Sequence, residues 1–519
     1  MRHVLQDRRP RLVRGALALT ATTVLATGCQ SAVQQADDAA ATPGGAASCQ
    51  QGGTLVVATS GAPQTNRVLA QSATNLMWAR AVFEPLMTVT TDSVDDPQPL
   101  LASSWEFSDD DREVVLQLQD GVTFHSGRAF TAADVVFSLQ QTLDPVNGAN
   151  VAPIIAQWDV QATGDLEVTI RSSTPLSPVL GSTLDMAPMV DSETWAGVTD
   201  GSQLIGTGPY QVESYSAGAS MALVRYEGYW QEEGSYLDRV ELNVVPDSTA
   251  QVSALRSGRT QLSNGLTVQD ALSVTEGSDQ FELDRTINGV YPMVLDQVPD
   301  QRVRQAIAYA IDKDRINEQV YGGLGTTEGL YWTPGSSDYP QDLAGPYPYD
   351  PDRARQLVEE AGAAGTEVPI TIINLPVIAA EYEIIANNLS EIGLVPSLTA
   401  LAPPDYQQRL AAGTGGNYLA LRGLNGTPAF MVQTNTDLRL AGAHRQTTTP
   451  EYEQLVQQVV DAEADQTAEA VSELTRYMND QAVVLGLVTT EGVSVRSSQV
   501  QNAPMDLMGW IPNQTCFVE

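Results

Sequence analysis

The chain has 519 residues, of which 42% are hydrophobic and 17% are charged, with 41 glycines and 29 prolines. This globular composition excludes a disordered, collagen-like or coiled-coil protein, and the length predicts two to four domains. The net charge of −36 argues against a nucleic-acid-binding protein, because binding to phosphate backbones requires a basic face.

The first 28 residues have the pattern of a bacterial export signal. Several arginines precede an apolar stretch at 15–26 that is too short to cross a bilayer. Gly28 then precedes Cys29, an arrangement that resembles a bacterial lipobox. Lipidation of Cys29 after cleavage would anchor the mature chain at the extracytoplasmic face of the cell membrane. An ordinary secretory signal with an incidental cysteine is the alternative. Residues 29–50 are polar and small and predict a flexible tether.

Two further cysteines, Cys49 and Cys516, lie near the two ends of the mature chain. In an oxidising compartment such a pair predicts a disulfide bond. Two unrelated thiols are the alternative.

Strands and helices alternate along the rest of the chain. Apolar runs or alternations predict strands at 54–58, 112–118, 166–170, 240–244 and 368–373. Caps and helical spacing predict helices after Thr131, from Asp300, from Asp350 to Gly362, over 381–391, and over one long stretch from Thr449 to about Ala482. Interleaved strands and helices favour an α/β fold.

Five segments carry a resemblance to a known family. They read VFEPL at 82–86 with PLLASSWE at 99–106, DGVTFHSGRAFTAADVVFS at 120–138, GTGPY at 206–210 with GYW at 228–230, RVRQAIAYAID at 302–312, and YDPDRA at 349–354 with AG at 361–362. In this order they resemble family 5 of the bacterial extracellular solute-binding proteins, the peptide, nickel and oligosaccharide receptors of ABC importers. The resemblance covers residues 52–490.

This resemblance implies an α/β fold in the form of a two-lobed periplasmic-binding-protein clamshell, with an extra inserted domain in the first lobe. The implied division is a signal peptide at 1–28, a tether at 29–50, a first-lobe core at 51–80, 200–285 and 491–519, an inserted domain at 81–199, and a second lobe at 286–490. This division puts Cys49 and Cys516 in the same lobe. The ligand is expected between the lobes.

Candidate ligand-binding residues follow from the resemblance and from sheet geometry. The loop that lines the cleft in relatives matches the segment with Arg422 and Asn425, and an arginine there could clamp a carboxylate or lie on the surface. Tyr331 and Trp332 could stack on a ring of the ligand. The remaining candidates are Gln64 and Asn66, after the first strand, and Trp78, which could face the cleft or the core.

Two ligand anchors known in the family are missing from the sequence. Peptide-binding members carry an aspartate soon after a Gly-Trp pair, but Leu424 stands in place of the tryptophan and the next acidic residue is Asp437. The mature chain has only two histidines, His125 and His444, and no His/Cys cluster with metal-ligand spacing. We therefore expect no metal and no cofactor.

The sequence predicts an import receptor and not an enzyme. It has no Gly-x-Ser-x-Gly elbow and no His-Glu-x-x-His motif. The expected function is the capture of a small solute, peptide or peptide-like, and its delivery to the permease and ATPase of an ABC importer by a monomer that binds no nucleic acid. An oligosaccharide or other small molecule is the alternative solute. A binding-only lipoprotein and a lipid-anchored glycoside hydrolase, which needs only two carboxylates, are the rival classes.

Overall fold

The computed structural model describes residues 49–70, 75, 77–90, 93–231, 235–424, 426–438, 449–503, 505–506, 509–510 and 513–518. Ser48–Glu519 forms one compact unit. None of the helices in this described part is long and apolar enough to cross a membrane. Cys29 and Asn425 lie outside the described residues.

One large mixed sheet runs through both lobes. Its strands follow the order β14-β13-β15-β12-β17-β11-β1-β10-β9-β8, and β16 pairs with β12 beside this path. The strands are β1 Thr54–Thr59, β8 Tyr210–Ser216, β9 Ser220–Arg225, β10 Arg239–Val244, β11 Leu262–Asn264, β12 Phe281–Leu295, β13 Glu367–Ile373, β14 Val395–Leu401, β15 Asn417–Leu419, β16 Arg422–Gly423 and β17 Val484–Ser497.

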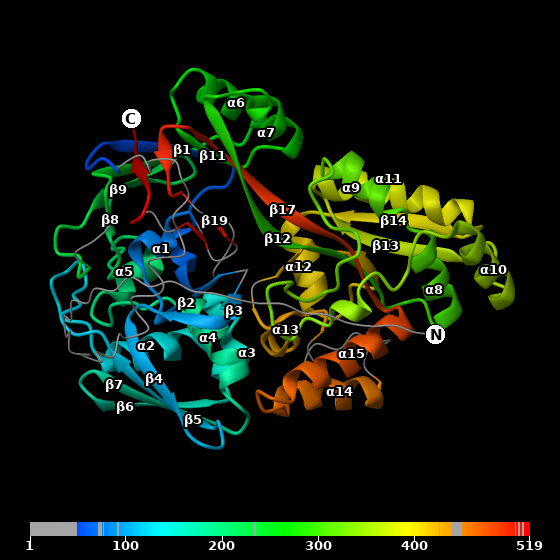
Figure 1. Cartoon of the computed structure of the whole chain (residues 1–519), viewed down its shortest axis with the longest axis horizontal. Helices are drawn as coiled ribbons and strands as arrows, with labels where there is room; N and C mark the ends of the chain where they lie inside the picture. The colour runs from blue at the N-terminus through cyan, green and yellow to red at the C-terminus, as the bar shows by residue number, and fades with distance from the viewer. Residues whose placement is uncertain are drawn as a thin grey trace, which may run out of the picture. The chain divides into compact units, whose positions relative to one another are not determined.

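The long strands β12 and β17 connect the two lobes. They pair antiparallel from Phe281 opposite Ser497 to Val294 opposite Val484, with two irregularities in the register. In Figure 1 they run side by side from the β1–β11 region into the β13–β14 region. Among the described residues, β12 and β17 are the strands that carry the chain from one lobe to the other, which is the position expected for the hinge of a clamshell.

The inserted domain has its own antiparallel sheet. It contains β4 Ala102–Phe107, β5 Glu113–Leu118, β7 Glu167–Ser172 and β6 Trp158–Gly164, paired in that order. Val114, Leu116, Val168 and Ile170 are fully buried, so the alternation in the sequence correctly predicts one apolar face. A hairpin of β2 Met87–Thr90 and β3 Ser93–Pro99 lies beside it, with α2 Ala132–Thr142, η3 Pro145–Asn147, α3 Ala152–Ile155 and α4 Ser177–Asp185.

The remaining helices belong to the lobe cores and to the closing surface. The first-lobe core holds η2 Thr65–Ala70, α1 Ala79–Val82, α5 Trp195–Asp200, α6 Ser248–Arg256 and α7 Val268–Thr275. The second lobe holds α8 Gln301–Ala310, α9 Lys313–Val320, η4 Gln341–Leu343, α10 Pro351–Ala361, α11 Pro376–Glu391, α12 Pro403–Ala411, α13 Pro428–Thr434, α14 Pro450–Asp461 and α15 Thr467–Gln481.

Two helix predictions differ from the structure in extent. The helix predicted at 381–391 begins earlier, at Pro376, which occupies the first helical position where a missing N–H costs nothing. The stretch predicted as one helix from Thr449 to Ala482 is two helices, α14 and α15, because the backbone at Ala462 is extended and breaks the hydrogen-bond ladder.

The two ends of the unit meet in the first lobe. Cys49 and Cys516 form a disulfide, with their Cα atoms 5.4 Å apart. Gln50 pairs with Phe517 of β21 Cys516–Phe517, and β21 in turn pairs with β18 Val500–Gln501. A second short pair, β19 Met505–Asp506 and β20 Gly509–Trp510, precedes β21.

Candidate functional site

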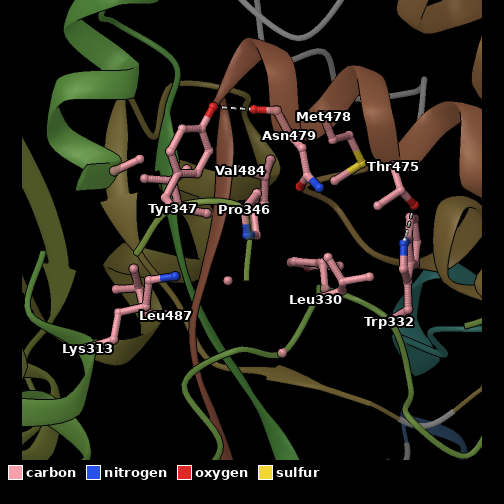
Figure 2. A pocket seen from close by; sticks show the side chains of 15 residues that line it. Lys313, Leu330, Trp332, Pro346, Tyr347, Thr475, Met478, Asn479, Val484 and Leu487 are labelled. Atoms are coloured by element: carbon pink, nitrogen blue, oxygen red, sulfur yellow. Dashed lines mark hydrogen bonds between the residues drawn. The ribbon is translucent and has the colours of Figure 1, made fainter. Parts of the chain in front are cut away.

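A small pocket in the second lobe is bordered by two of the candidate residues, Tyr331 and Trp332. The pocket lies between the 329–332 loop, α15 and β17, and its volume is about 30 Å³. Since one water needs about 10–15 Å³, this space holds about two waters and no larger solute. Figure 2 shows Lys313, the only lysine of the chain, on the same pocket. Burial lowers the pKa of its ammonium group.

Both aromatic candidates are held by hydrogen bonds inside the second lobe. The Trp332 ring nitrogen donates to Thr475 Oγ1 at 2.8 Å (Figure 2). The Tyr331 hydroxyl donates to Asp437 Oδ2 at 2.9 Å. The two residues are only 1% and 3% exposed. Their rings therefore pack within the lobe and present no open face for stacking on a ligand in this structure.

Arg422 lies on β16, next to the hinge strand β12, and forms an ion pair with Asp437. Its Nη2 donates to Asp437 Oδ1 at 2.8 Å, and its Nε donates to Oδ2. The hydroxyl of Tyr418 donates to Asp437 Oδ1 at 2.6 Å, and Tyr331 completes the set. Burial acts to raise the pKa of Asp437, but the charge and hydrogen bonds of Arg422 and the tyrosine hydroxyls lower it to about 2.

This cluster determines what Arg422 can offer a ligand. The carboxylate of Asp437 neutralises the guanidinium, and the arginine side chain is 14% exposed. A ligand carboxylate would thus meet an arginine that already has a counter-ion. The sequence shows Asp437 as the first acidic residue after the cleft loop. Because Asp437 lies 15 residues from Arg422, the sequence alone does not indicate that the two pair.

The first-lobe candidates have different surroundings. Gln64 and Asn66 are exposed just beyond the carboxyl end of β1. Trp78, in contrast, is fully buried in the apolar core of the first lobe, and its ring nitrogen donates to Asn75 Oδ1 at 3.1 Å. Of the two alternatives for Trp78, cleft or core, this structure has the core, because the ring packs among core side chains such as Phe83.

The lobes touch each other along one closing surface. Helix α13 of the second lobe packs against α3 and α4 of the inserted domain. Phe430 and Met431 of α13 are buried in the same apolar cluster as Ile154 and Leu180. Thr427 Oγ1 donates to the carbonyl of Pro178 at 2.5 Å. This contact closes the space between the lobes in the described conformation.

Comparison with known proteins identifies the family. Residues 96–437 match the model of the middle part of the bacterial extracellular solute-binding proteins, family 5. The chain belongs to this family. It is 31% identical over 373 residues to heme-binding protein A of Haemophilus influenzae, a match that covers 64% of this chain and 67% of that protein.

Two further similarities concern a glutathione-binding protein and a solved structure. The chain is 31% identical over 273 residues to the glutathione-binding protein GsiB of Pectobacterium atrosepticum. This match covers 51% of this chain and 52% of that protein, so it spans about half of the relative's length. The fold matches the ABC transporter substrate-binding protein CtaP of Listeria monocytogenes with a TM-score of 0.78 and 21% identity, covering 91% of this chain and 100% of that one. The two-lobed α/β clamshell predicted from the sequence is thus confirmed.

Other motifs of the sequence serve the fold. Glu84 of the first motif is buried and accepts hydrogen bonds from Tyr229 (2.7 Å) and Trp230 (3.1 Å) of the GYW segment. Burial raises its pKa to about 7. Among the described residues, no group of three or more His, Cys, Asp or Glu side chains could hold a metal ion.

Proposed function

We propose that this protein is the receptor of an ABC importer, anchored through Cys29 at the extracytoplasmic face of the membrane. It captures a small solute, peptide or peptide-like, between its two lobes as a monomer and presents it to a permease and its ATPase. The observation that carries the proposal is the pair of hinge strands, β12 and β17, with a closing surface between the lobes. Family membership supplies solute binding, and a glutathione-binding relative supports a peptide-like solute.

The ligand contacts proposed here come from both lobes. Gln64 and Asn66 are exposed at the carboxyl end of a sheet strand, where open α/β sheets place ligands. Arg422, with Asn425 after it in the chain, would contribute from the second lobe. The proposal keeps the division of the chain into a first lobe, an inserted domain at 81–199 and a second lobe at 286–490.

The experiment that tests solute capture is native mass spectrometry of the mature chain, purified without its signal peptide. A co-purified mass that fragments as a peptide supports the proposal, whereas a sugar-like mass moves the solute to an oligosaccharide. The same solute returned unchanged after incubation excludes turnover. If no mass is retained, a thermal-shift screen with di- and tripeptides follows, in which ligand at 100 times its Kd stabilises by about 2.7 kcal/mol. No stabilisation by any peptide would contradict a peptide receptor.

The anchor is tested separately by metabolic labelling with a radioactive fatty acid. The wild-type chain should carry label and sediment with membranes. Cys29→Ser should lose the label and appear in the medium, whereas the control Cys49→Ser should keep the label. Label on the Cys29→Ser chain would contradict lipidation at this residue.

A further inference from the structure

A polar pocket lies on the closing surface, between the inserted domain and the second lobe. Its volume is about 180 Å³, which is room for several non-hydrogen atoms. Strand β3 and helix α4 form one wall. Residues 337–338, Thr427 and the start of α15 form the other. Any group bound here contacts both lobes at once.

Two carboxylates from opposite lobes lie on this pocket. Asp95 of β3 accepts a hydrogen bond from Ser336 Oγ at 3.1 Å and another from the backbone N–H of Ser337. Asp338 lies beside these serines on the second lobe, half-buried. Burial and the negative charge of Asp95 raise the pKa of Asp338 to about 6. The two negative charges repel each other when the lobes are closed, whereas the hydrogen bonds from Ser336 and Ser337 to Asp95 favour closure. A positive charge between the carboxylates would remove the repulsion.

The hydroxyl groups around the pocket are arranged to accept hydrogen bonds. Ser177 Oγ already donates to Asp111 Oδ2 at 2.6 Å, Thr427 Oγ1 to the carbonyl of Pro178, and Thr467 Oγ1 to the carbonyl of Glu463 at 3.1 Å. A hydroxyl that has given its hydrogen away retains only lone pairs. These three hydroxyls thus offer lone pairs to a ligand that carries donors, although Thr427 Oγ1 already accepts the backbone N–H of Phe430 at 3.2 Å.

Another residue on the pocket, Ser182, has a hydroxyl without a hydrogen-bond partner among the described residues. Ser182 of α4 is 1% exposed, and its hydroxyl makes no hydrogen bond within the part of the chain that the structure describes. A buried hydroxyl without a partner costs free energy, and a bound group that hydrogen-bonds to it would recover part of this cost. This observation is independent of the two carboxylates.

We propose that this pocket binds a cationic amine group of the transported solute, a primary ammonium or a guanidinium, between Asp95 and Asp338. Such groups carry only donors and a positive charge, which matches the two carboxylates and the lone pairs of the hydroxyls that have already given their hydrogens away. The bound cation removes the repulsion between the carboxylates, so the solute favours the closed state by its differential affinity. The inference rests on the proposed receptor function and specifies the chemical class of its solute.

An inorganic cation is the competing occupant. Calcium takes six to eight oxygen ligands, several of them carboxylates. Only Asp95 and Asp338 supply carboxylates among the described residues on this pocket. An organic ammonium needs only about three acceptors, and the pocket supplies more than that.

The test uses calorimetric titration of the mature chain at pH 7.5 and low salt with ethylammonium, putrescine and agmatine. Wild-type protein should bind at least one of them saturably, and Asp95→Asn and Asp338→Asn should each weaken this binding at least tenfold. Asp96→Asn is the matched control, because this exposed neighbour on β3 does not line the pocket. Thermal midpoints check that the variants fold.

Three results would overturn the proposal. They are no saturable binding of any of the three amines, equal binding by wild type and Asp338→Asn, or a site that takes calcium but no amine. Native mass spectrometry separates this failure from failure of the receptor function. A co-purified solute that Asp338→Asn binds as tightly as wild type leaves the receptor intact and removes only the cation pocket.

Discussion

At the scale of single residues, the Arg422–Asp437 ion pair means that a substitution at Arg422 affects the stability of the fold as well as any contact with a ligand. The sequence leaves two alternatives for Arg422, a clamp for a ligand carboxylate or a surface residue. In the structure its partner Asp437 is 1% exposed and depends on Arg422 for its charge balance. Removing one member of a buried ion pair leaves an uncompensated charge in the interior. Arg422 therefore contributes to folding as well as to any ligand contact.

We predict that Arg422→Ala lowers the free energy of unfolding of the ligand-free protein by about 3–5 kcal/mol. Guanidinium chloride denaturation at pH 7 measures this change. Arg302→Ala is the control, because Arg302 pairs with Asp300 at an exposed site, and such pairs contribute at most about 1 kcal/mol. Adding Asp437→Asn to Arg422→Ala should recover part of the loss. Equal stabilities of Arg422→Ala and wild type would show that the pair does not form.

A second residue-scale prediction concerns Glu381 on α11. Glu381 is fully buried, its Oε1 has no hydrogen-bond partner among the described residues, and the Tyr321 hydroxyl lies 3.4 Å from Oε2. Burial raises its pKa to about 8. The folded chain keeps this proton to about pH 8, whereas the unfolded chain releases it near the ordinary pKa of 4.5. Stability from this group is complete below pH 4.5 and is lost as the pH rises through 8.

Glu381→Gln should therefore flatten the fall in unfolding free energy between pH 5 and 8, by about 3–4 kcal/mol over the whole interval. Urea denaturation at one-unit steps of pH measures the slope. Glu84, whose pKa is raised to about 7, continues to contribute a smaller fall in the variant. An unchanged slope between pH 7 and 8 would mean that Glu381 is ionised in the folded protein.

At the scale of elements, the 206–208 turn shows how separate motifs depend on one another. The backbone N–H of Gly206 donates to Nδ1 of His125 at 3.3 Å, and His125 Nε2 donates to the carbonyl of Gly208 at 2.9 Å. Burial lowers the pKa of His125 to about 4, so the ring stays neutral and can accept and donate in this way. The second and third motifs of the sequence are thus joined by one imidazole.

Gly206→Ala should destabilise the protein by about 3 kcal/mol or more, because a Cβ at this position would lie 1.9 Å from the carbonyl oxygen of Val82. Gly121→Ala is the control. Its φ of +77° suits glycine, but no atom of the described residues lies within 4 Å of the added Cβ, so the cost is about 1–2 kcal/mol of backbone strain. Thermal unfolding of both variants measures the difference. A Gly206→Ala protein as stable as Gly121→Ala would contradict the close approach.

Local signals explain which elements the sequence predicts well. Helix α10 is predicted from end to end because Asp350 caps it, Pro351 occupies its first position and Gly362 closes it with a φ of +65°. The break between α14 and α15 carries no proline or glycine, so nothing in the local sequence separates the two helices. Trp78 is likewise ambiguous, since an amphipathic ring suits both a core and a cleft.

At the scale of the whole molecule, the resemblance predicts the lobes but not their contact. The five motifs lie within the lobes, where residues such as Glu84 and His125 connect them. The closing surface uses β3, α4, α13 and residues 336–338, which lie outside those motifs. Contacts between segments more than 200 residues apart leave no periodicity in a single sequence. The polar pocket with Asp95 and Asp338 was therefore visible only in the structure.

The disulfide acts on the whole chain because it joins residues separated by 467 positions. It ties the segment before β1 to β21, so that Gln50 and Phe517 pair beside it. A cross-link over so long a loop restricts the unfolded chain strongly, and removal of native disulfides typically costs about 2–5 kcal/mol. In the folded state the two ends already meet through strand pairing, which predicts a native fold that persists without the bond but is less stable.

The double variant Cys49→Ser/Cys516→Ser should accordingly keep its secondary structure and lose about 2–5 kcal/mol of unfolding free energy. Circular dichroism and urea denaturation measure the two quantities. Wild-type protein in reducing agent should behave like the double variant, while the double variant itself should not respond to reducing agent. Alkylation of two thiols in the oxidised, denatured wild-type chain would contradict the bond. A loss of solute binding together with full secondary structure would show that the bond also positions the first lobe for closure.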